Sequence, residues 1–136
     1  MRLLSVIGKL VSVRAAGRLN LWLPVVLWMS LIFYSSSLPG RDLPELFIHQ
    51  DIVFHLLAYL LLGYLFSRAA KETYQFREFP GLIIFTVVFC LLYGIIDELH
   101  QLFVPGRECS AMDVLVDGTG GLLGGIIVSA RSMVRK

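Results

Sequence analysis

Residues 81–103, GLIIFTVVFCLLYGIIDELHQLF, form an almost wholly apolar run that ends in a cluster of polar side chains. The run is long enough for a helix to span a lipid bilayer, which takes roughly 20 residues. The polar cluster, DELHQ at residues 97–101, is costly to place in a membrane, and ionisable groups found there usually serve a function. The stretch therefore predicts a membrane-spanning helix with a functional site at one end.

The composition of the whole chain also indicates a membrane protein. Hydrophobic residues make up 57% of the 136 residues and charged residues only 16%, and the mean hydropathy is +0.76. A chain this short has too much surface for its volume to bury so many apolar side chains in a water-soluble core. Much of the apolar surface must face lipid, which excludes an ordinary soluble domain.

Four apolar segments are each about long enough to span a bilayer. They cover residues 21–36, 51–70, 81–103 and 112–130. We therefore expect an all-α polytopic membrane protein, with a bundle of four transmembrane helices over residues 21–130. Residues 1–20 are expected to form an amphipathic arm on the cytoplasmic membrane surface, and residues 131–136 a basic cytoplasmic tail.

The basic residues indicate the orientation of these helices. Four Lys or Arg lie in the N-terminal arm, three near the second connection and three near the C-terminus, against only Arg41 and Arg107 in the other two connections. Lys and Arg are enriched in cytoplasmic loops, so both termini are expected to be cytoplasmic. The net charge of +2 then reflects topology, and we expect no nucleic-acid partner.

Polar residues of three expected helices fall in the same outer third of the membrane. On each helix they recur every three or four residues, which places them on one face. These residues are Asp51, His55 and Tyr59 in the second helix, Asp97, His100 and Gln101 in the third, and Asp113 and Asp117 in the fourth. Glu98 lies about 100° around the helix from Asp97 and need not face the same site. Arg107 follows the third helix and is expected near the mouth of the site.

Serine residues near this end predict helix caps. Ser110 and Asp113 have the spacing of a capping box, with Ser110 as the N-cap of the fourth helix and Asp113 three residues later. This gives Asp113 a structural role as an alternative to a role in the site. Ser35, Ser36 and Ser37 end the first helix, where they either cap it or contribute hydroxyl groups to the site.

The fourth helix contains small residues at a spacing typical of close helix packing. Gly120 with Gly124 and Gly121 with Gly125 are two such pairs, and glycine lets two backbones approach closely. Packing within the four-helix bundle is one interpretation, and homo-oligomerisation through the same face is the other.

Taken together, these motifs resemble the VanZ-like family of bacterial membrane proteins. The resemblance runs from about Trp22 to Gly125. Its motifs are Asp51-x-x-x-His55-x-x-x-Tyr59, Asp97-Glu98-x-His100-Gln101, Pro105-Gly106-Arg107, Asp113 and the glycine-rich run from Gly118 to Gly124. It implies a multi-pass protein of the bacterial cytoplasmic (inner) membrane. The association of the family's namesake with resistance to the glycopeptide teicoplanin implies a role at the cell envelope. Ile52 stands where the family often has Lys, and Asp117 where Asn is common.

Two classes of function fit these side chains. In the first, the site acts on or binds an envelope lipid, a lipid-linked precursor or a glycopeptide-related ligand. The candidate catalytic residues, as acids, bases or metal ligands, are Asp51, His55, Asp97, Glu98, His100 and Asp113. The candidate binding residues are Tyr59, Gln101, Arg107 and Asp117, with Arg107 suited to a phosphate group. In the second class, a non-catalytic binding, transport or scaffold protein uses the same residues to hold the bundle together. The cofactor, the metal dependence and the choice between enzyme and binding protein stay open at this point.

Overall fold

The computed structural model describes residues 2–40, 47–76 and 79–134, with side chains for residues 17–40, 47–76 and 80–131. Its elements are α1 (Arg2–Ser36), α2 (Gln50–Tyr74), α3 (Phe79–Gln101) and α4 (Ala111–Val134), and the described residues include no strand. Each helix contains a segment long and apolar enough to cross a membrane. The prediction of an all-α protein with four membrane-spanning helices is therefore confirmed.

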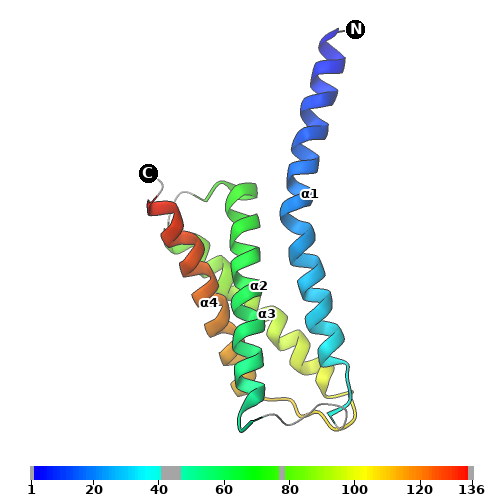
Figure 1. Ribbon diagram of the computed structural model, residues 1–136, viewed down its shortest axis with the longest axis vertical. Coiled ribbons are helices and arrows are strands. Elements are labelled where there is room, and N and C mark those ends of the chain that lie inside the picture. Colours follow the sequence, from blue (N-terminus) through cyan, green and yellow to red (C-terminus); the bar gives the residue numbers. More distant parts are fainter. Residues whose placement is uncertain (1, 41–46, 77–78, 135–136) are drawn as a thin grey trace.

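Helix α1 is one continuous helix of 35 residues. At 1.5 Å per residue it is about 50 Å long, well beyond the roughly 30 Å of a bilayer's apolar core. Its candidate span is Gly17–Ser36, and the part before that span projects beyond the other helices (Figure 1). Residues 2–16 therefore continue the membrane-spanning part of α1 as a helix. Their placement on the membrane surface remains a prediction.

Glycine residues bring α4 close to α2 and α3. A Cβ atom added to Gly120 would lie 2.8 Å from the carbonyl oxygen of Leu56 in α2, and one added to Gly121 would lie 2.6 Å from Cβ of Cys90 in α3. Real Cβ atoms almost never approach other atoms so closely, so only glycine fits these positions unless a neighbour moves. The structure therefore uses the glycine-rich face of α4 within the chain.

Helix α1 is held against the other helices mainly by aromatic side chains. The indole Nε1–H of Trp22 donates to Oγ1 of Thr73 at 2.9 Å, and that of Trp28 donates to the carbonyl of Ala58 at 2.8 Å. The hydroxyl of Tyr93 in α3 donates to the carbonyl of Met29 at 2.7 Å. These bonds satisfy polar atoms that would otherwise meet lipid, where an unpaired group is costly.

The helices place the polar cluster at one end of the bundle. The N-terminal end of α1 and the C-terminal end of α4 lie toward the opposite end (Figure 1). At the polar end, the backbone N–H of Gly40, just after α1, donates to the carbonyl of Pro105, just after α3, at 3.1 Å. A Cβ atom on Gly40 would collide with the carbonyl oxygen of Gly106. This close backbone contact ties the segment after α1 to the α3–α4 connection.

Candidate functional site

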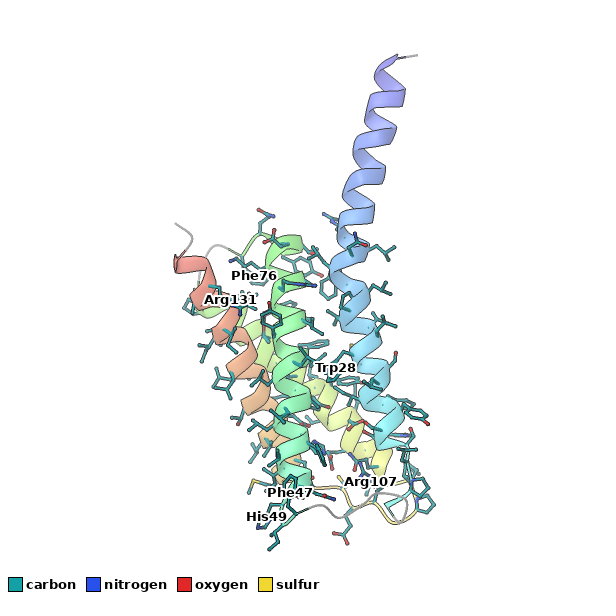
Figure 2. All side chains as sticks on the ribbon, in the orientation of Figure 1. Trp28, Phe47, His49, Phe76, Arg107 and Arg131 are labelled. Carbon is teal, nitrogen blue, oxygen red and sulfur yellow. The ribbon has the colours of Figure 1, made fainter. Side chains whose placement is uncertain are left out.

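A cavity of about 1020 Å³ lies at this end of the bundle. Residues from all four helices and from the α3–α4 connection line it. Its predicted site residues are Asp51, His55, Tyr59, Asp97, Gln101, Arg107 and Asp113. Figure 2 shows Arg107 at the loop end of the bundle and Trp28, which also lines the cavity, further along α1. The cavity therefore extends from the polar end of the bundle into its apolar part.

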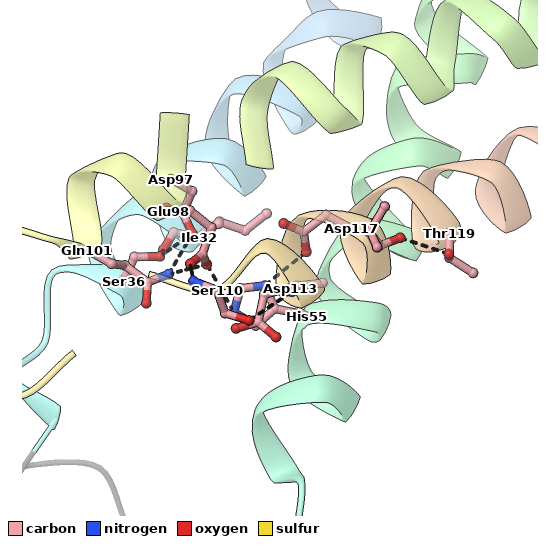
Figure 3. A network of polar contacts seen from close by, with 12 residues as sticks. Ile32, Ser36, His55, Asp97, Glu98, Gln101, Ser110, Asp113, Asp117 and Thr119 are labelled. Atoms are coloured by element: carbon pink, nitrogen blue, oxygen red, sulfur yellow. Dashed lines mark hydrogen bonds and ion pairs between the residues drawn. The ribbon is translucent and has the colours of Figure 1, made fainter. Parts of the chain in front are cut away.

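His55 of α2 is oriented by a buried carboxylate of α4. Its Nδ1 lies 2.9 Å from Oδ1 of Asp117 (Figure 3). The other oxygen of Asp117, Oδ2, is buried and has no hydrogen-bond partner among the described residues. A Cβ atom on Gly94 would lie 2.5 Å from that oxygen, so the glycine in α3 makes room for the carboxylate. Asp117 does not line the cavity and lies behind His55.

Glu98 joins the same cluster, although the helical spacing from Asp97 left this undecided. Its Oε1 lies 3.9 Å from Nε2 of His55, and its Oε2 accepts a bond of 2.7 Å from the backbone N–H of Ser110. Glu98 is almost fully buried. Its carboxylate thus lies between the imidazole of α2 and the first turn of α4.

Asp97 connects α3 to the end of α1. The Ser36 hydroxyl donates to Oδ2 of Asp97 at 2.7 Å. The side-chain amide of Gln101 donates to the same oxygen at 3.3 Å and to Oε1 of Glu98 at 3.0 Å. Gln101 therefore bridges two carboxylates that are adjacent in sequence (Figure 3). Oδ1 of Asp97 is buried without a partner among the described residues.

The cap of α4 is shared between two helices. Oγ of Ser110 accepts a bond of 3.3 Å from the backbone N–H of Asp113, as the capping box predicts. In a complete capping box, the side chain three residues later would accept the backbone N–H of Ser110. Here that N–H goes to Glu98 instead. The carboxylate of Asp113 is therefore not needed for the cap.

The carboxylate of Asp113 lies close to His55 and Glu98. One ligand atom from each of these three residues lies within 4.8 Å of the other two. The three side chains come from α2, α3 and α4, so only the folded bundle brings them together. One imidazole and two carboxylates are suitable ligands for a divalent cation, and the same groups can move a proton as a general acid or base.

The remaining predicted residues lie around this centre or apart from it. Asp51 is exposed at the rim, whereas the hydroxyl of Tyr59 is buried in the lining and has no partner among the described residues. Arg107 lines the cavity with a buried Nε that is likewise unpaired. His100 lies apart: its Nε2 is 3.0 Å from the Ser37 hydroxyl, its ring stacks on Phe33, and it does not line the cavity.

The sequence alone did not assign three parts of the site. Ser36 was one of three serine residues with either a capping or a site role. Glu108, which lines the cavity, has no signal beyond its place after Arg107. The apolar lining from α1 and the middle of α2, including Leu31 and Leu57, could not be separated from ordinary lipid-facing residues. Only the packing of the helices distinguishes these positions.

The site holds an excess of buried negative groups. Its carboxylates are Asp97, Glu98, Asp113 and Asp117, all of them buried. In the part of the chain that the structure describes, His55 is the one basic side chain within ion-pair distance of any of them. Buried charges are normally paired or bound to metals. The arrangement is therefore suited to hold a cation or protons.

Comparison with protein families gives a match over most of the chain. A family model described as VanZ/LLP1 matches residues 21–132, which include every predicted site residue. This confirms the resemblance drawn from the motifs. No curated protein and no solved structure matches the chain significantly.

Proposed function

The chain belongs to the VanZ/LLP1 family, and on this premise we propose that its cavity binds a cell-envelope lipid or a lipid-linked precursor and acts on its headgroup. The observation that carries the proposal is the division of the cavity into a polar end and an apolar part. An amphiphile has the same division, with a polar headgroup and apolar chains. A bundle held together only by internal hydrogen bonds would not need such a cavity.

The apolar part of the cavity is accessible from outside the bundle. Leu57 of α2 is 57% exposed and Leu31 of α1 is 51% exposed, and both line the cavity. Phe54 lines it too and is also exposed. In a bilayer these side chains would contact lipid, so an acyl or prenyl chain could lie along α1 and α2 without leaving the apolar phase.

The polar end supplies groups suited to an anionic headgroup. Arg107 has an unpaired buried Nε, and a guanidinium group forms strong, directional hydrogen bonds with phosphate oxygens. Within the same cavity, His55 is held by Asp117 in a defined orientation. An imidazole held in this way is suited to general acid or base chemistry on a bound headgroup.

The asymmetry of basic residues supports an orientation in which the cavity opens at the outer face of a bacterial cytoplasmic membrane. Envelope precursors carried on lipids are exposed there, and glycopeptide antibiotics act on that side. A change in the headgroups present at this face would alter susceptibility to teicoplanin. This is how the proposal connects to the resistance associated with the family's namesake.

The test is a binding measurement in detergent micelles with a fluorescent phosphatidylglycerol. We expect Leu57→Trp to weaken binding at least fivefold, because the indole would fill the apolar part of the cavity. Leu115→Trp is the matched control, since Leu115 of α4 is 62% exposed and does not line the cavity. Equal binding by the parent and both variants would refute an amphiphile site in this cavity.

A further inference from the structure

We infer that His55, Glu98 and Asp113 bind one divalent transition-metal ion, of the class of Zn²⁺ or Mn²⁺. The inference deepens the proposed function and rests on it in one respect: the ion would attract the anionic headgroup of the lipid. The binding of the ion itself can be tested without any lipid.

The spacing of the three side chains fits a metal site. Their ligand atoms all lie within 4.8 Å of one another. Nitrogen and oxygen ligands lie about 2.0–2.2 Å from such an ion, so two ligands in a tetrahedral arrangement are about 3.3–3.6 Å apart. Small side-chain rotations would close this difference. Each ligand comes from a different helix, so an ion here would also join α2, α3 and α4.

The orientation of His55 favours a metal at its other ring nitrogen. When Nδ1–H donates to Oδ1 of Asp117, Nε2 carries a lone pair that points toward the carboxylates. Nε2 lies 3.9 Å from Oε1 of Glu98, which is too long for a direct hydrogen bond. A lone pair facing a carboxylate is repulsive unless a positive species lies between them. A carboxylate that orients a metal-binding imidazole from behind is a recurring feature of metal sites.

Buried polar atoms without partners provide an independent observation. Asp97 is 2% exposed and Tyr59 is 1% exposed, and both line this cavity. Oδ1 of Asp97 and the hydroxyl of Tyr59 have no hydrogen-bond partner among the described residues. Buried polar atoms are nearly always paired, so these two atoms indicate a polar ligand in the cavity. Water molecules bound to a metal ion would provide such partners.

The ligand types narrow the class of ion. Imidazole nitrogen favours Zn²⁺ and similar ions, whereas carboxylate oxygen also accepts Mn²⁺ and Mg²⁺. One imidazole with two carboxylates therefore fits Zn²⁺ or Mn²⁺ better than Mg²⁺ or Ca²⁺. An ion with two positive charges would also offset part of the excess negative charge of the four buried carboxylates.

The experiment uses the full chain, purified in detergent and stripped of metal with a chelator. Zn²⁺ and Mn²⁺ are titrated separately by calorimetry, and the bound metal is counted by elemental analysis after dialysis. We expect one ion per chain for at least one of the two metals. Asp113→Asn should lower the affinity at least tenfold, and its cap should survive, because the bond to Ser110 uses the backbone N–H of residue 113.

The controls are a histidine and a carboxylate outside the three proposed ligands. His49→Asn changes an exposed histidine whose backbone has a positive φ of 61°, which asparagine tolerates. Glu72→Gln changes an exposed carboxylate near the C-terminal end of α2, which does not line the cavity. Both should bind metal like the parent chain. Absence of stoichiometric binding by the parent, or equal losses in the controls and in Asp113→Asn, would overturn the inference.

A second arm separates this inference from the proposed function. Binding of fluorescent phosphatidylglycerol and of inorganic phosphate is measured with and without the metal. If the metal increases binding of the lipid, and the lipid binds more tightly than free phosphate, the result supports both the metal site and the proposed function. Lipid binding by a chain that takes up no metal overturns the inference and leaves the proposed function intact. Metal uptake without any lipid binding refutes the proposed function and leaves the metal site intact.

Discussion

The backbone N–H of Ser110 donates a hydrogen bond of 2.7 Å to Oε2 of Glu98, so the third helix caps the fourth. The first N–H groups of a helix have no partner within the helix and need one elsewhere. Glu98 supplies it from α3, and the carboxylate of Asp113 is left to face His55. One contact thus connects the start of α4 to the composition of the candidate site.

Removing this cap should destabilise the loop end of the bundle. Glu98→Ala would leave the N–H of Ser110 without its acceptor and would also remove one of the two partners of Gln101. We expect a loss of about 1–3 kcal/mol in unfolding free energy, which is typical of a buried hydrogen bond to a charged group. Thermal unfolding in detergent measures the change. Glu108→Ala, an exposed carboxylate in the same connection, is the control, and an unchanged melting temperature for both variants would contradict the assignment of the cap.

The packing of α4 against α2 can be tested at two neighbouring glycines. A Cβ atom on Gly124 would lie 2.5 Å from the carbonyl oxygen of Leu60, whereas one on Gly125 would lie no closer than 3.5 Å to Oγ of Ser67. Gly124→Ala should therefore force α2 and α4 apart and lower the melting temperature clearly. Gly125→Ala should leave it nearly unchanged or raise it, because alanine is the better helix former. Equal effects would mean that α4 packs on a different face in solution.

The expected topology places Cys109 outside the cytoplasmic membrane and both termini inside. Cys109 is free and exposed in the α3–α4 connection, whereas Cys90 is buried in α3. A thiol reagent that cannot cross membranes should label intact cells producing the parent chain. It should not label cells producing Cys109→Ser. Fusions of a reporter to the C-terminus should report a cytoplasmic location, and a periplasmic reporter would place the cavity on the wrong side for an outward-facing site.

Asp97 and His100 should differ in their importance for function. Asp97 lines the cavity and is bonded to Ser36 and Gln101, whereas His100 is bonded to Ser37 and does not line the cavity. We expect Asp97→Asn to abolish any effect of the protein on teicoplanin susceptibility while normal amounts of protein accumulate in the membrane. His100→Gln should retain most of the effect.

The comparison requires that the effect be normalised to the amount of membrane-inserted protein. If activity falls only in proportion to the amount of folded protein, the polar residues act as a scaffold for the bundle. If His100→Gln is as damaging as Asp97→Asn at equal protein levels, the site extends to the contact between α1 and the end of α3.

Features that depend on one helix alone were predictable from the sequence. The length and apolarity of the segments determine the four helices, because a backbone in lipid must satisfy its own hydrogen bonds. Ser110 was identifiable as an N-cap from the residues beside it, and the glycine spacing of α4 indicated close packing. These signals are local, so they do not depend on the arrangement of the helices.

The composition of the site depended on the tertiary structure. Helical spacing gives the angle between two side chains on one helix, but the direction of the neighbouring helix is set by how side chains of both helices pack. For this reason Glu98 faces His55 although it lies off the face of Asp97, and His100 turns to Ser37. The sequence alone determined that polar residues gather at one end of a membrane bundle. The crossing of α1, α2, α3 and α4 decided which of them meet, because the contacts of His55 with Asp117 and Glu98, and of Ser36 with Asp97, join atoms from different helices.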